Sequence, residues 1–204
     1  KEGRPDPVGN GIRAQIAEDL GLNVDAVRVV DVYTIDAQLS DTELDQLRQE
    51  LFTDSIIQNS VANRTISSDF DYLIEVGFRP GVTDNVGKSA AEGISDTLGR
   101  ALNAGEAVYK STQYAIKGGL TPEDCERIAR DLLANGLIQR WVVQSGDAMR
   151  SAPSPFLLDL PVVTDRSEVT VHPVNLDIDD DALVQLSDRM MLALELHEMK
   201  AIQA

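Results

Sequence analysis

Several residue types that support common chemistries are scarce in this chain of 204 residues. Its one cysteine, Cys125, excludes an internal disulfide framework and favours a reducing, cytoplasmic compartment. Its two histidines, His172 and His197, have no cysteine near them, so zinc ligation is a poor expectation. The 18 Lys and Arg stand against 34 Asp and Glu, a formal net charge of −16. This balance argues against nucleic acid or an anionic membrane surface as the partner.

Long apolar runs and catalytic signatures are missing as well. No run approaches the length of a membrane span, and the start at Lys1 has no apolar signal region. There is no Walker-type phosphate loop and no G-x-G-x-x-G pattern. The serines have no base at a recognisable spacing. A stand-alone hydrolase is therefore the weakest of the functions that we consider.

What the chain does contain is an internal repeat. Asp84-Asn85-Val86-Gly87 matches Asp6-Pro7-Val8-Gly9, which lies 78 positions earlier. Behind each match, apolar residues recur every fourth position and predict a helix with one buried stripe: Val8, Ile12, Ile16 and Leu20 in the first copy, and Val86, Ala90, Ile94 and Leu98 in the second. Asp6 and Asp84 stand where a carboxylate would cap the helix N-terminus.

The repeat continues at an offset of 81. Residues 27–35 and 108–116 both read as strands, with Tyr33 matched to Tyr114. Helix starts follow at Ser40, with Glu43 completing a capping box, and at Thr121, with Pro122 in the first helical position. Cys125 then takes the place of Leu44 on the apolar stripe, which favours a core residue over a nucleophile. Each copy is expected to end in a last strand, which is clearest at residues 138–144 of the second copy.

These patterns predict an α+β fold made of two tandem ferredoxin-like units with antiparallel sheets, related by a pseudo-twofold axis. Residues 70–78 alternate strictly, so we expect a strand with one buried face and with Asp71, Glu75 and Gly77 on the other face. The counterpart of this strand would precede Lys1, so the first repeat is expected to lack its opening strand. The expected domains are residues 1–66, residues 67–145, and a linker segment with a helix at 146–204.

The region after the repeat is less regular. Residues 146–155 are expected to be a linker, and residues 156–163 either a segment that covers the sheet or a further strand. Residues 168–176 are expected to be extended. The acidic run at 177–181 fits a solvated helix start better than a calcium loop, whose glycine and terminal glutamate it lacks. One helix is expected from Asp181 through Ile202.

No residue stands out as catalytic, cofactor-binding or metal-binding, but six are candidates for a partner interface. Asp84 and Asn85 could place helix N-terminal amides against an anion, although an ordinary cap is the simpler interpretation. Tyr33 and Tyr114 could meet across the pseudo-twofold axis, or be core tyrosines. Arg140 and Trp141 end the duplicated part with an edge suited to a partner or to the covering segment, with packing the simpler role for Trp141.

The repeat with its order of motifs resembles a known family. Residues 81–87, the tyrosine strand and the helix ending at 132–139 are similar to the PurS subunit of phosphoribosylformylglycinamidine synthase. Two such units followed by a linker and a helix like residues 194–202 resemble the N-terminal region of the large PurL form of that enzyme. The departures are the missing first strand and Pro7 in the place of Asn85.

The resemblance implies a non-catalytic assembly region of an ATP- and glutamine-dependent ligase of purine biosynthesis. Its partners would be a PurQ-type glutaminase and a PurM-like synthetase domain, whose ATP and magnesium sites would lie beyond Ala204. No cofactor is therefore expected in this region. The alternative is a free-standing tandem α+β module that senses a small ligand between its halves.

Overall fold

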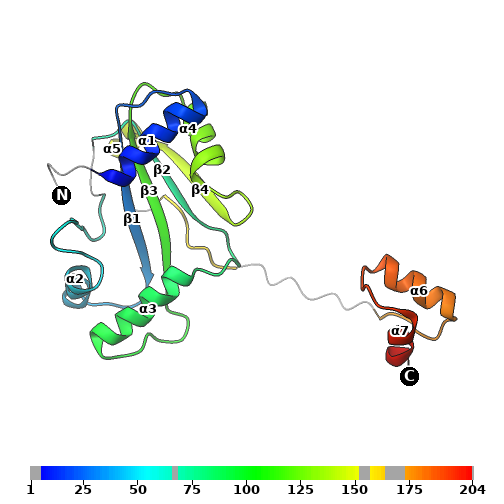
Figure 1. Ribbon diagram of the computed structural model, residues 1–204. Coiled ribbons are helices and arrows are strands. Elements are labelled where there is room, and N and C mark those ends of the chain that lie inside the picture. The colour runs from blue at the N-terminus through cyan, green and yellow to red at the C-terminus, as the bar shows by residue number, and fades with distance from the viewer. Residues whose placement is uncertain (1–5, 66–68, 152–156, 164–172, 204) are drawn as a thin grey trace. The chain divides into compact units, whose positions relative to one another are not determined.

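The computed structural model describes residues 6–65, 69–151, 157–163 and 173–203 (Figure 1). The chain divides into two compact units, residues 1–164 and residues 165–204. The first unit is α+β, as expected, with one antiparallel sheet. Its elements, in chain order, are α1 (Pro7–Leu20), β1 (Ala26–Asp36), α2 (Asp41–Glu50), β2 (Tyr72–Phe78), α3 (Asn85–Leu98), β3 (Ala107–Lys117), α4 (Pro122–Ile128), the π-helical turn η1 (Ala129–Leu133), β4 (Gln139–Ser145) and α5 (Gly146–Ser151).

The sheet has the strand order β1-β3-β2-β4, so the two equivalent strands of the repeat, β1 and β3, pair with each other. Their register sets Val27 opposite Ile116 and Ile35 opposite Val108, and each of these residues has its repeat counterpart 81 positions away. At the centre, Asp31 lies opposite its own counterpart, Thr112. The register is therefore symmetric about this pair, which marks a local pseudo-twofold axis. The two halves share one sheet rather than forming two.

The helix that precedes each of these strands is fastened to it in the same way in both copies. The Oδ1 atom of Asp6 accepts a hydrogen bond from the Gly9 amide (2.8 Å), and its Oδ2 atom accepts one from the Val29 amide (3.1 Å). Asp84 does the same with the amides of Gly87 (2.7 Å) and Lys110 (2.6 Å). The predicted caps are confirmed, and each one also ties its helix to the neighbouring strand.

Glycine is required where the first helical turn meets the strand. A Cβ atom on Gly9 would lie 2.1 Å from the carbonyl oxygen of Val27, and one on Gly87 would lie 2.2 Å from that of Val108. Both distances are far shorter than a van der Waals contact, so neither position accepts a side chain without a shift of backbone. The glycines recur 78 positions apart because the same close approach is built twice.

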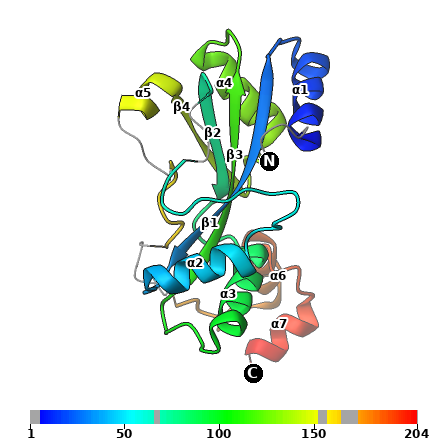
Figure 2. The same cartoon turned by 90° about the vertical axis from the view of Figure 1, so that its left-hand side faces the viewer.

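The hydrophobic core mixes the two copies. One cluster contains Ile16 from α1 together with Cys125 and Ile128 from α4, and the other contains Leu47 from α2 together with Ile94 from α3. Figures 1 and 2 show α1 and α4 over one end of the sheet, and α2 and α3 over the other. Each helix pair takes one member from each copy. For this reason the duplicated part is a single compact unit.

Strand β2 is buried on both faces, which differs from the expectation of one exposed face. Glu75 is only 1% exposed. Residues 157–163, here called the strap, lie on the face of the sheet opposite α1 (Figure 2). The alternation of residues 70–78 correctly predicted a strand. Nothing in that segment indicates that its second face is covered by the strap, which follows some eighty residues later. The strap itself contains no strand, so the covering segment was the better of the two expectations.

Two other local expectations fail. Val8 and Val86, the first residues of the predicted apolar stripes, are 60% and 48% exposed, while Ile16 and Ile94 are fully buried. A four-residue spacing advances about 40° beyond a full turn at each step, so the ends of such a stripe rotate away from the core. The counterpart of β4 in the first copy is also not a strand, since residues 58–65 have no regular structure.

The C-terminal part differs from expectation as well. Residues 146–151 form α5 rather than a linker, and the one predicted helix is two, α6 (Asp180–Arg189) and α7 (Leu196–Gln203). Between them Met191 and Ala193 have φ of 53° and 54°, and the buried Ser187 hydroxyl donates to the Leu194 carbonyl at 2.9 Å. That turn ends α6 although its apolar periodicity continues. Leu183, Leu186 and Met199 form the core of this unit.

Asp179 caps α6 through the Ala182 amide at 2.9 Å, so the acidic run is a helix start, as predicted. The extended segment expected at 168–176 lies mostly outside the described residues. Among the described helices, none is long and apolar enough to cross a membrane.

Candidate functional site

The centre of the β1–β3 pair carries a polar group of side chains at the pseudo-twofold axis. Lys110 Nζ lies 2.9 Å from Asp31 Oδ1 and donates to Thr112 Oγ1 at 3.0 Å. The lysine side chain is only 14% exposed, and its Nζ lies 5.7 Å from the centroid of the Tyr33 ring. Since its repeat counterpart is Val29, this ion pair exists in one copy only. The amine is held by neighbours from both copies.

Tyr33 and Tyr114 occupy equivalent positions on either side of this centre rather than facing each other. The direct cross-strand partner of Tyr33 is Lys110, and that of Tyr114 is Val29. Tyr33 packs against Phe52, with ring centroids 4.6 Å apart, while Tyr114 packs against the α1–α4 cluster. Burial, and then the charge of Asp31, raises the pKa of both hydroxyls. They remain neutral, half-buried packing residues at ordinary pH.

Asp84 and Asn85 do not form an open anion site. Both oxygens of Asp84 accept backbone amides, one from α3 and one from β3. Its carboxylate therefore already stands at the positive end of the helix, where a bound anion would have to sit. Asn85 begins α3 and is exposed. The structure supports the simpler interpretation of an ordinary cap, with the added tie to β3.

The most elaborate polar cluster is the one under the strap. Glu75 Oε1 accepts from Ser111 Oγ at 2.5 Å, and its Oε2 accepts from Gln113 Nε2 and from the Leu157 amide, each at 2.9 Å. The buried carboxylate thus links β2, β3 and the strap. A buried acceptor of this kind is tolerated only when its hydrogen bonds are made. Glu75 is the polar anchor of the strap.

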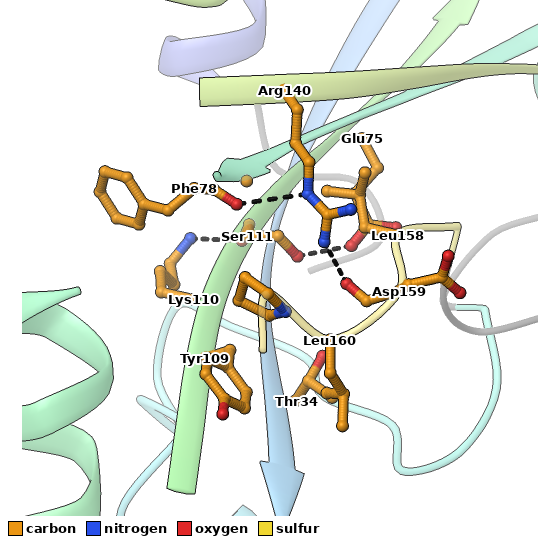
Figure 3. A pocket seen from close by; sticks show the side chains of 12 residues that line it. Thr34, Glu75, Phe78, Tyr109, Lys110, Ser111, Arg140, Leu158, Asp159 and Leu160 are labelled. Carbon is orange, nitrogen blue, oxygen red and sulfur yellow. Dashed lines mark hydrogen bonds between the residues drawn. The ribbon is translucent and has the colours of Figure 1, made fainter. Parts of the chain in front are cut away.

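Arg140 and Gly77 complete the attachment of the strap. The guanidinium of Arg140 donates from Nε to the Phe78 carbonyl at 3.3 Å and from Nη2 to the Asp159 carbonyl (Figure 3). A Cβ atom on Gly77 would lie 2.8 Å from Cδ1 of Leu158, so the missing side chain makes a notch for that leucine. Arg140 therefore contacts the covering segment, one of the two roles expected for it.

Trp141 lies on the opposite face of β4 and belongs to packing. It packs against the α1–α4 cluster, and its Nε1 donates to Glu126 Oε2 at 2.8 Å. Cys125 is fully buried, and desolvation raises the pKa of its thiol to about 12, so the prediction of a core residue is confirmed. His197 is 76% exposed beside Glu195, and His172 lies outside the described residues.

Sequence reasoning missed the strap site. Glu75 was placed on the open face, and Ser111 and Gln113 were not singled out. The available signal was a pair of uncharged polar residues at alternate positions of a strand otherwise rich in apolar side chains, next to a strand with one carboxylate. Gly77 inside a strand was a second signal, because an interior glycine often marks the close approach of another segment.

The arrangement is suited to holding segments of chain, and the polar groups already satisfy one another. Among the described residues, no group of three or more His, Cys, Asp or Glu could hold a metal ion. The hollow beside the strap is lined by residues of β1, β2, β3, β4 and the strap, Lys110 and Arg140 among them (Figure 3). Compared with models of known protein families and with curated proteins, the chain matches none of them.

Proposed function

We propose that this chain is a non-catalytic assembly module, the PurS-like N-terminal region of a phosphoribosylformylglycinamidine synthase. In this role it organises a PurQ-type glutaminase and a PurM-like synthetase domain, which together use glutamine and ATP to make the amidine. The module needs no cofactor of its own. ATP and magnesium belong to the synthetase.

The observation that carries the proposal is the pairing of the two equivalent strands, β1 and β3, about a pseudo-twofold axis. Each helix pair on the sheet likewise contains one helix from each copy. Caps, close-approach glycines and strand register recur at fixed offsets, so one chain reproduces the geometry of a symmetric dimer. The sequence resemblance points to a family whose small subunit works as such a dimer. The strap supports the proposal further, since it fixes the path of the chain after the duplicated part.

The test uses the full-length enzyme and compares its glutamine-dependent and ammonia-dependent rates. Deletion of residues 1–145 removes the module. We expect the glutamine-dependent rate to fall at least about tenfold more than the ammonia-dependent rate, because ammonia from solution does not need the glutaminase to be docked. The proposal fails if both rates survive the deletion unchanged.

A milder pair of variants controls for general damage. Gly87→Ala alone disrupts the attachment of α3 to β3, while Gly11→Ala, whose Cβ would meet nothing within 4 Å, leaves α1 intact. The first variant should reproduce the selective loss of the glutamine-dependent rate, and the second should not.

A ligand-sensing regulatory module is the second candidate, but the hollow beside the strap has a volume of only about 20 Å³, which is room for about one water molecule and not for an amino acid or a nucleotide (Figure 3). Calorimetry on this chain separates the two functions. A saturable signal with an amino acid or a nucleotide, lost in Arg140→Ala, supports the sensor. The assembly module gives a signal only with its protein partners.

A further inference from the structure

Each copy of the repeat contains the same hydrogen-bonded turn, at residues 54–58 and 135–139. In the first, the Asp54 amide donates to Gln58 Oε1 (2.9 Å) and the Ile56 amide donates to Asp54 Oδ1 (2.8 Å). In the second, the Asn135 amide donates to Gln139 Oε1 (2.8 Å) and the Leu137 amide donates to Asn135 Oδ1 (3.1 Å). The bonds match position by position at the offset of 81.

Both turns present aliphatic side chains to solvent. Ile56 is 69% exposed and its counterpart Leu137 is 87% exposed, and the next residues, Ile57 and Ile138, are 54% and 42% exposed. A single exposed aliphatic residue is ordinary in a soluble protein. Here, two neighbouring aliphatic residues are exposed at equivalent positions of both turns, which the ordinary frequency of exposed aliphatic residues does not explain. We call Ile56 and Leu137 the aliphatic tips.

The two turns keep their shape although different residues support them. Around the second, Arg79 Nε donates to the carbonyls of Gly136 (3.1 Å) and Gln139 (2.9 Å). Near the first, Thr53 Oγ1 donates to Ser60 Oγ at 2.6 Å, and Arg48 Nη1 donates to the same oxygen at 3.1 Å. The shared feature of the two sites is thus the turn with its exposed side chain, and not the scaffold beneath it.

The two tips lie near opposite edges of the sheet. Residues 135–139 lead into β4, one edge strand, while residues 54–58 lie on the side of the other edge strand, β1 (Figure 1). The symmetric register of β1 and β3 relates the two copies by the pseudo-twofold axis. A single partner that receives both tips along this axis would carry two like pockets in twofold arrangement.

The acidic residues in the segments that lead to the tips indicate which charge the rims of those pockets would carry. Residues 41–58, which lead to the first tip, hold five acidic residues and one basic residue, and residues 122–139 hold four acidic and two basic residues. A second copy of this chain, with its net charge of −16, would bring like charges together. Lysine and arginine around the pockets would be complementary.

We propose that the aliphatic tips are paired docking points for one protein partner that carries two like apolar pockets, related by a twofold axis and rimmed by basic residues. The inference rests on the proposed function, because it assigns the contact points by which the assembly module holds one of its partners. Simultaneous engagement of both tips makes binding bivalent within a single complex.

The test titrates the whole chain, by calorimetry, into a purified PurQ-type glutaminase and, separately, into a purified PurM-type synthetase from the same organism. The variants are Ile56→Ser, Leu137→Ser and the two combined, with Met191→Ser as the control, because Met191 is 89% exposed in the other unit. We expect one module per twofold partner. Each single variant should weaken binding about 10- to 100-fold, the double variant more, and the control not at all.

Each other outcome is decisive. Unchanged affinity of the double variant for a partner that the wild type binds overturns the inference and leaves the proposed function standing. Two partner molecules bound per chain, with one lost in each single variant, overturns the twofold partner. Binding of the wild type to neither protein refutes the proposed function and the inference with it. Urea unfolding followed by Trp141 fluorescence shows that the variants are folded, since the altered side chains are exposed.

Discussion

Replacing Gly87, at the start of α3, and Gly11, inside α1, by alanine should change the free energy of unfolding in opposite directions. In Gly87→Ala, the new methyl group would lie 2.2 Å from the Val108 carbonyl oxygen and 2.7 Å from Oδ2 of Asp84. The carbonyl belongs to β3, where Val108 is paired with Ile35 of β1, so the first turn of α3 has to move instead. In Gly11→Ala, the new methyl group meets nothing within 4 Å.

The loss of stability in Gly87→Ala can be estimated from the hydrogen bonds of Asp84 that the displaced turn weakens. Moving the turn weakens the Asp84 cap, worth about 1 kcal/mol, and its charged hydrogen bond to the Lys110 amide, worth about 1.5–3 kcal/mol. Residual crowding adds about 1 kcal/mol. We expect Gly87→Ala to lower the free energy of unfolding by about 3–5 kcal/mol. Gly11→Ala should raise it by about 0.5–1 kcal/mol, because alanine is the better helix former.

Urea unfolding followed by tryptophan fluorescence measures the stability changes of both variants, Gly87→Ala and Gly11→Ala. Trp141 is the only tryptophan of the chain and lies in β4, so its signal reports on the first unit alone. With a slope of about 2 kcal/mol per molar urea, the midpoint for Gly87→Ala should fall by about 1.5–2.5 M. Gly9→Ala should behave alike, since its methyl group would lie 2.1 Å from the Val27 carbonyl. A midpoint for Gly87→Ala within about 0.2 M of the wild type, or equal damage by Gly11→Ala, would refute the reasoning.

Three further predictions concern single side chains. Glu75→Gln leaves one acceptor oxygen for three donors, so limited proteolysis with mass spectrometry should find cleavage within the strap at least about tenfold faster than in the wild type. The amide and then the hydroxyl of Ser40, followed by Arg100, lower the pKa of Glu43 to about 2. Because the folded-state pKa is depressed, this stabilisation is present above the unfolded-state value near 4.5 and is lost as pH falls towards 2, so Ser40→Ala should reduce the fall in stability over that range. Burial raises the pKa of Cys125 to about 12, so its thiol should react with an aromatic disulfide reagent only after unfolding.

Each of these predictions has a control or an outcome that would contradict it. Glu92→Gln changes an exposed carboxylate on α3 and should leave proteolysis of the strap unchanged. The acid titration is contradicted if Ser40→Ala and the wild type lose stability in parallel between pH 4.5 and pH 2. Reaction of Cys125 at the same rate in buffer and in urea would contradict its place in the α1–α4 cluster.

The parts of the fold that depend on neighbours in sequence could be predicted. The Asp6 and Asp84 caps, the Ser40 capping box and the Thr121 cap all act within a few residues, and each is found where it was expected. The internal repeat made these predictions firmer, because every local signal occurred twice.

The parts that depend on distant segments could not. Whether Glu75 faces solvent is decided by the strap, and whether Val8 is buried is decided by the exact position of a helix on the sheet. Gly9 and Gly87 were found as part of the repeated motif, but the reason for glycine there is a carbonyl on a strand about twenty residues away in the chain. The end of α6 depends on Ser187, whose hydroxyl is bonded to the backbone of Leu194.

The central pair of the sheet, Asp31 opposite Thr112, shows what joining the two copies in one chain makes possible. In a homodimer with the same strand pairing, this position would face itself, and aspartate would meet aspartate. Once both copies are encoded in one gene, the two residues can evolve separately. Asp31 has Lys110 as its ion partner, whereas the repeat counterpart of that lysine is Val29. At the pseudo-twofold axis, the two halves of the chain therefore differ chemically, which two identical subunits could not do.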